Sequence, residues 1–111
     1  MAQLEEQTSS QTGTKFIFTE AFISGDTFVN NGSHKLLVKN DSGGEITITF
    51  ISANTCNFGA ADIRAHDRVD VIPANEIRFF RDFDPLRFND LQSRVSMTYS
   101  DVTGLSLACF V

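Results

Sequence analysis

Short segments in which apolar and polar residues alternate recur along most of this chain, and they constrain its fold more than any other feature. In residues 45–52, Ile46, Ile48 and Phe50 alternate with threonines, as in a strand with one buried face. The same period of two marks further segments, which turn-forming residues separate: 15–19, 35–40, 67–73, 75–81, 93–100 and 104–111. Regularly spaced short strands of this kind indicate an all-β sandwich or barrel.

We predict a single antiparallel β-sandwich of about seven to eight strands, of which a jelly roll is one arrangement. Several of the connections between the expected strands have hairpin length. The longer connections at residues 53–67 and 82–93 are expected to be loops. Residues 60–67 could form a single helical turn, and no other segment has a convincing helical pattern.

The N-terminal residues differ in composition from the rest of the chain. Residues 1–14 are rich in Gln, Thr, Ser and Glu, and Leu4 is their one large aliphatic residue after Met1. They cannot bury enough apolar surface to order themselves. We therefore expect residues 1–14 to be a flexible N-terminal arm and residues 15–111 to be one β-sandwich domain, since 111 residues are too few for two ordinary domains.

The composition excludes several classes of partner. A formal net charge of −5 argues against nonspecific nucleic-acid binding, which depends on phosphate neutralisation. No apolar run approaches the ~18 residues of a membrane span, and the N-terminus has no signal-peptide pattern. We expect no nucleic-acid and no membrane partner, in a protein made and kept in a cytoplasm. Eleven Phe residues, with one Tyr and no Trp, indicate rings in the core or in protein contacts.

No group of residues indicates catalysis, a cofactor or a metal. Asp62, His66 and Asp67 are the one candidate group, in which the i, i+4 pair Asp62 and His66 could share a helical face. A solvated loop is the better interpretation, because no second His or Cys lies nearby. Asp82 and Asp84 stand in a segment typical of a turn with solvated charges. We therefore predict a non-enzymatic protein with no cofactor and no metal site.

The two cysteines are isolated in the sequence. Cys56 and Cys109 lack the C-x-x-C spacing of redox or zinc sites, so we expect free thiols in a reducing compartment. Cys109 lies on the apolar side of its expected strand, which indicates a core residue rather than a nucleophile.

A polar stretch between residues 24 and 34 raises the question of a site. Asp26, Asn30, Asn31 and Gly32 precede a segment with strand character, and Asn and Gly tolerate a positive φ. Local backbone chemistry therefore explains these four residues without any ligand. We interpret them as a structural corner that directs the next strand.

The segment from residue 78 to residue 90 is the strongest candidate for a functional surface. It contains four Phe and three Arg in thirteen residues, a density that resembles interface hot spots. We predict a protein interface formed by Arg78, Phe80, Arg81, Phe83, Arg87 and Phe88. The alternative is that Phe79, Phe83 and Phe88 fill the core while the arginines pair with Asp82, Asp84 and Asp90.

The order of these features resembles a group of small virion proteins of tailed bacteriophages. The similarity is carried by the stretches "GDTFVNNGSHKLLVKNDSGGEITITF", "HDRVDVIPANEIRFF" and "SRVSMTYSDVTGLSLA", within residues 24–110. In that group a "G-D-x-F-x-N-x-G" corner opens an "L-x-V-K-N" strand, and the chain closes on a "V-x-V-x-Y-S" hairpin. Residues 82–86 replace the group's usual Gly-Pro-Phe-Pro-like turn, and the loop at 53–66 is distinctive.

The resemblance implies a capsid decoration or cement protein of the virion, assembled in the host bacterial cytoplasm. Its expected partners are the major capsid protein or neighbouring virion proteins, in a homo-oligomer or multicopy assembly. One alternative is a head-to-tail connector or another neck or tail component. Another is a carbohydrate-binding β-sandwich, which the absence of Trp disfavours.

Overall fold

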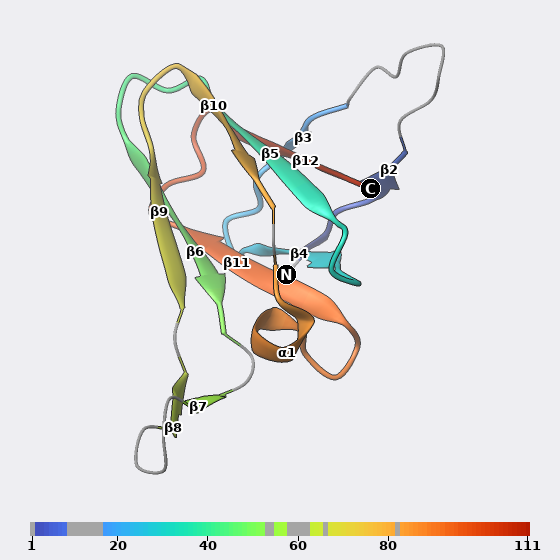
Figure 1. Ribbon diagram of the computed structural model, residues 1–111. Helices are drawn as coiled ribbons and strands as arrows, with labels where there is room; N and C mark the ends of the chain where they lie inside the picture. Colours follow the sequence, from blue (N-terminus) through green and yellow to red (C-terminus); the bar gives the residue numbers. More distant parts are fainter. Residues whose placement is uncertain (1, 9–16, 53–54, 58–62, 66, 82) are drawn as a thin grey trace.

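The protein is an all-β sandwich, as predicted (Figure 1). The computed structural model describes residues 2–8, 17–52, 55–57, 63–65, 67–81 and 83–111. Sheet A has five strands in the order β1 (Ala2–Gln3), β4 (Asp26–Val29), β11 (Arg94–Tyr99), β6 (Ile46–Ile51) and β9 (Arg68–Ile72). Sheet B has the order β10 (Glu76–Phe80), β5 (Lys35–Asn40), β12 (Leu105–Phe110) and β2 (Glu6–Gln7), and β3 (Thr19–Glu20) also pairs with β12.

The chain crosses between the two sheets at each main connection from β4 onward, except between β6 and β9. β6 and β9 are antiparallel neighbours in sheet A, and a small separate sheet lies between them in sequence. Its strands are β7 (Thr55–Asn57) and β8 (Ile63–Ala65), which lie at the lower end of Figure 1. The predicted loop at 53–67 therefore contains an antiparallel strand pair. The helical turn expected at 60–67 is wrong at residues 63–65, which form β8.

Six of the predicted strands are confirmed, because β5, β6, β9, β10, β11 and β12 lie within the expected segments. The segment at 15–19 overlaps β3 only at Thr19, and residues 15 and 16 lie outside the described part. β4 was not predicted. Its inward side carries Asp26, which hides the apolar alternation. The expected loop at 82–93 contains a single helical turn, α1 (Pro85–Phe88).

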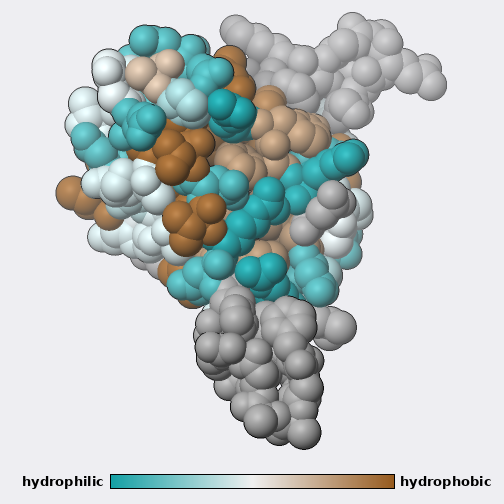
Figure 2. All heavy atoms as spheres, turned by 60° about the vertical axis from the view of Figure 1, so that its left-hand side comes forward, coloured by the Kyte–Doolittle hydropathy of each residue, from teal (hydrophilic) through white to brown (hydrophobic). Residues whose placement is uncertain are grey.

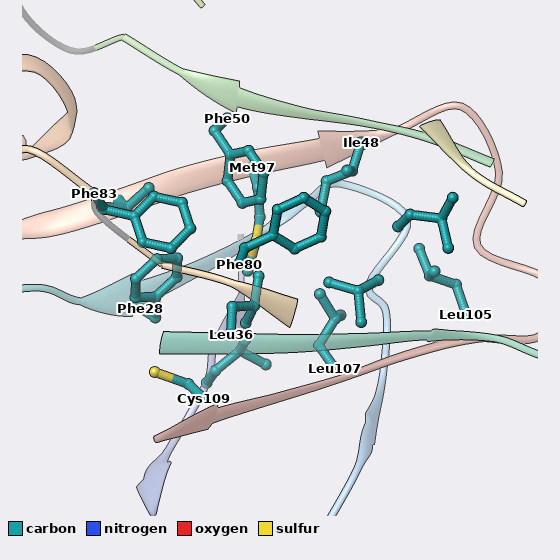
Figure 3. Packing of buried hydrophobic residues seen from close by; sticks show 14 of the residues in the cluster. Phe28, Leu36, Ile48, Phe50, Phe80, Phe83, Met97, Leu105, Leu107 and Cys109 are labelled. Carbon is teal, nitrogen blue, oxygen red and sulfur yellow. The ribbon is translucent and has the colours of Figure 1, made fainter. Parts of the chain in front are cut away.

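The core lies between the two sheets and consists of aliphatic side chains at one end and phenylalanine rings at the other (Figure 3). Inward-facing positions of β5, β6, β11 and β12 are almost fully buried, so the alternation in these strands was assigned correctly. β9 and β10 differ. Val69, Val71, Ile77 and Phe79 point away from the core and are about half exposed or more.

The N-terminal segment pairs with both sheets. β1 is parallel to β4 in sheet A, β2 is parallel to β12 in sheet B, and the sheets are therefore mixed rather than wholly antiparallel. Between the two strands, Leu4 is buried in the core, and its N–H donates to the Thr27 carbonyl at 2.8 Å.

This pairing differs from the free arm expected over residues 2–8. The prediction from composition considers only the apolar side chains of the segment. It does not include the backbone N–H and C=O groups at the edge of a sheet, with which a polar segment can also pair. Residues 9–14 lie outside the described part, and the domain boundary at residue 15 stays a prediction.

We expect Leu4→Ala to lower the free energy of unfolding by about 2 kcal/mol or more, because it removes a buried side chain and leaves a cavity. Leu91→Ala is the matched control, since Leu91 is fully exposed and its truncation should change stability by less than about 0.5 kcal/mol. Urea unfolding measures both. Equal stability of the two variants would contradict the docking of the N-terminal segment.

Candidate functional site

The corner at residues 30–32 ties β4 to the loop that follows β10. Asn30 is buried, and its Nδ2 donates to the Phe83 carbonyl at 2.9 Å and to Asn89 Oδ1 at 2.8 Å. Its Oδ1 accepts from the Gly32 N–H at 2.9 Å, while Asn89 Nδ2 donates to the Asn30 carbonyl at 2.6 Å. Buried amides cost free energy unless they are hydrogen bonded, and all polar atoms of this side chain have partners. The network is a structural cross-link.

Gly32 has a positive φ of 101°, which agrees with the prediction for this corner. The Asn31 side chain supports the same turn, because its Oδ1 accepts from the Ser33 N–H at 3.1 Å. The strands on either side do not pair with each other, since β4 belongs to sheet A and β5 to sheet B. The corner therefore carries the chain from one sheet to the other and is not a hairpin.

Asp26 is a buried hydrogen-bond acceptor rather than an exposed ligand. Its Oδ2 accepts from the Tyr99 hydroxyl at 2.5 Å and from the Phe22 N–H at 3.1 Å. Burial, and then the neighbouring Asp26 carboxylate, raise the pKa of Tyr99 well above its usual range. Tyr99 therefore stays a proton donor to Asp26, and the pair links β11 to β4.

His34 joins the corner to the N-terminal segment. The ring is buried, its Nδ1 accepts from the Asn31 N–H at 3.2 Å, and its Nε2 contacts the Glu6 carboxylate. Both ring nitrogens are thus engaged in contacts within the chain. Together with Asp26, Asn30 and Gly32, this arrangement supports the scaffold interpretation of the whole stretch.

Three residues of the predicted interface are core residues, and that part of the prediction is corrected. Phe80, Phe83 and Phe88 are 6%, 1% and 2% exposed, so their side chains cannot reach a partner. Phe83 packs against Phe28, Phe50 and Phe88 with ring centroids 5.1, 4.9 and 6.0 Å apart (Figure 3). The alternative interpretation is therefore correct for Phe83 and Phe88, whereas Phe79 lies on the surface.

An arginine that sequence reasoning missed covers this aromatic cluster. The Arg68 guanidinium carbon lies 5.4 to 5.7 Å from the ring centroids of Phe50, Phe80 and Phe83. Its Nε donates to Asp70 Oδ2 at 3.0 Å, so the charge is also paired. The alternation in this strand put Arg68 opposite the apolar Val69 and Val71, which suggested that Arg68 faces the solvent. The sequence gave no signal that Arg68 instead faces the core phenylalanines.

The arginines of the predicted interface lie at or near the surface. Arg78 and Arg81 are exposed, and Arg87 is half-buried over the Phe88 ring at 4.7 Å. Arg78 Nη2 lies 3.0 Å from Glu76 Oε2, a local pair that differs from the expected partners Asp82, Asp84 and Asp90. Asp82 itself lies outside the described residues.

The exposed apolar side chains near these arginines form the better candidate surface. Ile77 and Phe79 of β10 are 56% and 50% exposed and lie on the side of sheet B that faces away from the core. Strand register puts Leu37 of β5 beside Phe79, and the Phe79 and Phe110 ring centroids are 5.9 Å apart. We call Leu37, Ile77, Phe79 and Phe110 the sheet B outer patch. Figure 2 shows apolar side chains gathered between hydrophilic ones on the side that carries β9 and β10.

Other predicted groups are accounted for where the structure describes them. Asp62 and His66 lie outside the described residues, and Asp67 Oδ1 accepts from the Ser52 N–H at 2.7 Å. Among the described residues no three His, Cys, Asp or Glu side chains are grouped to hold a metal ion. Within the same part of the chain, no helix has the length and hydropathy to span a membrane.

Comparisons with known proteins do not add a family to this fold. The chain matches no protein family model, no curated protein and no solved structure. The fold and the candidate surface together define the class, an all-β sandwich with an apolar patch on one outer face.

We expect Gly32→Val to lower the free energy of unfolding by about 1 kcal/mol or more, because a β-branched residue is strained at positive φ. The nearest atom to an added Cβ is Pro85 Cγ at 3.7 Å, an ordinary contact distance, so the added Cβ itself does not clash. Gly43→Val is the control, since Gly43 has open space and no positive φ. Thermal unfolding compares them, and an unchanged melting temperature for the Gly32 variant would contradict the turn assignment.

We expect Cys109 to resist alkylation in the folded protein. Burial, and then the charge of Glu6, raise the pKa of the thiol to about 12, and the reactive thiolate forms only near or above that pH. Iodoacetamide treatment of a Cys56→Ser variant, followed by mass spectrometry, should show modification only after denaturation. Rapid labelling of the folded protein at mildly alkaline pH would contradict this environment.

Proposed function

We propose that this chain is a non-enzymatic structural protein of a bacteriophage virion, which binds the major capsid protein shell and stabilises it. The observation that carries the proposal is the sheet B outer patch, where Ile77 and Phe79 are exposed and the Phe79 ring lies beside Phe110. The resemblance of residues 24–110 to small virion proteins supports the choice of partner.

The chemistry of the patch suits a protein partner. Exposed aromatic and aliphatic side chains that adjoin one another gain free energy when a partner removes them from water. Lys35 and Lys39 flank the patch on β5, with their ammonium groups 5.9 Å from the Phe110 centroid and 5.6 Å from the Phe18 centroid. An apolar centre with a charged margin is the usual anatomy of a protein interface.

A shell makes a small patch effective. Each copy of a decoration protein meets the same capsid surface, so a modest contact is repeated over the whole particle. Contacts that span neighbouring capsid subunits raise the effective concentration of the second contact. A rigid sandwich presents the patch with little ordering cost on binding, because the patch residues Leu37, Ile77, Phe79 and Phe110 lie on paired strands.

We expect Phe110→Glu to weaken binding to empty capsid shells by about tenfold or more, because it replaces the ring beside Phe79 with a charge that a partner must desolvate. Thr98→Glu is the matched control on β11 of the other sheet, where binding should be unchanged. Co-sedimentation with shells measures occupancy, and circular dichroism verifies that both variants are folded.

Co-sedimentation, the copy number per particle and a glycan-binding screen together separate the alternatives. If the Phe110→Glu variant is folded and binds shells as tightly as the unmodified chain, the patch is not the capsid contact. A copy number that corresponds to a single ring per particle would favour the head-to-tail connector, neck or tail role. Binding in a glycan screen, with no binding to shells, would favour the carbohydrate-binding role.

A further inference from the structure

β10 is an open edge strand. It lies at one end of sheet B and pairs with β5 from Glu76 opposite Asn40 to Phe80 opposite Leu36. Within the described part of the chain, no strand pairs with its other side. Such an edge presents backbone N–H and C=O groups with which another strand can pair.

The other edge strands of the two five-stranded sheets are less suited than β10 to pairing with a second copy. β1, β2 and β3 are each two residues long. β9 carries Arg68, whose guanidinium lies over the core rings and whose Nη1 donates to the Arg81 carbonyl at 3.2 Å. Short strands and inward-pointing charges both hinder pairing between edges. β10 also has charges on its core side, but Glu76 and Arg78 pair with each other and are about half exposed. The strand is five residues long, exposes Ile77 and Phe79, and contains neither proline nor lysine.

The charges on β10 are self-complementary. Glu76 and Arg78 flank Ile77, and their side chains are about half exposed at 48% and 47%. If two antiparallel copies of the strand pair about a two-fold axis at Ile77, residue 76 of one copy lies opposite residue 78 of the other. Each Glu76 then faces an Arg78. An axis at Arg78 would instead put two arginines opposite each other, which destabilises a sheet.

We propose that two copies of this chain associate through antiparallel pairing of their β10 edges, centred on Ile77. The two outer patches become one surface, on which Ile77 and Phe79 of both copies are neighbours. Paired backbone extends over residues 76–78 of each copy, because Asn75 has a positive φ of 60° and lies outside the strand. The dimer is therefore weak and forms with rising concentration. This association does not depend on the proposed virion role.

Charge reversal distinguishes pairing between copies from effects within one copy. Glu76→Arg gives a β10 with two positive charges, and Arg78→Glu gives one with two negative charges. Each variant alone places like charges across the axis, so its dimer should be about tenfold weaker than that of the unmodified chain. An equimolar mixture of the two variants restores both opposite-charge contacts, although neither variant has the internal Glu76–Arg78 pair.

Sedimentation velocity over a concentration series measures the unmodified chain, each variant and the mixture. We expect heterodimers in the mixture with an affinity near that of the unmodified dimer. An unmodified chain that stays monomeric at every concentration would overturn the proposal. A mixture that associates no better than its components would overturn it as well.

Engineered cysteines test the register. In a Cys56→Ser background, Ile77→Cys places two thiols opposite each other on the axis, and mild oxidation should give a disulfide-linked dimer on a non-reducing gel. Phe79→Cys is the matched control on the same face of the same strand, and it should cross-link poorly because residue 79 lies opposite residue 75. Equal cross-linking of both variants, or none for Ile77→Cys, would overturn the axis at Ile77.

Discussion

The position of Phe83 is the constraint on which the rest of the structure depends. It lies between β10 of sheet B and β11 of sheet A, so the chain must cross the sandwich at this point. Its ring packs against Phe28 and Phe50 of sheet A, and its carbonyl accepts from the buried Asn30 amide. One residue therefore fixes the loop after β10, the corner before β5 and the spacing of the two sheets at the aromatic end of the core.

The Arg68 guanidinium extends this constraint to the surface. It lies over Phe50, Phe80 and Phe83, and it is also bonded to Asp70 and to the Arg81 carbonyl. A half-buried cation at a ring face is stabilised by the ring quadrupole and by its own ion pair. The aromatic end of the core is thus closed by a polar group that has its hydrogen bonds satisfied.

The sequence predicted the fold class and most strands because alternation reports directly which residues share a face. It could not assign the buried face of β9 and β10, since Val69 and Phe79 suit a core as well as an exposed patch. In residues 78–90 the density of Phe and Arg indicated an interface, and three of the four rings are buried in the core. Density does not distinguish a ring such as Phe83, which fills the core, from Phe79, which lies outside it. The corner was predictable because Gly32 has a positive φ, a conformation that glycine adopts far more readily than other residues.

The N-terminal segment links the beginning of the sandwich to its final strand. β2 pairs with β12 at Cys109 and Phe110, and the Val111 N–H donates to the Gln7 carbonyl at 2.9 Å. During synthesis on the ribosome, β2 is made long before β12, and it can pair only after β12 has emerged. Contacts between residues so far apart in sequence form slowly, because the intervening chain must be ordered first. Until then β2 has no partner strand, and its unpaired backbone groups are open to pairing with other chains.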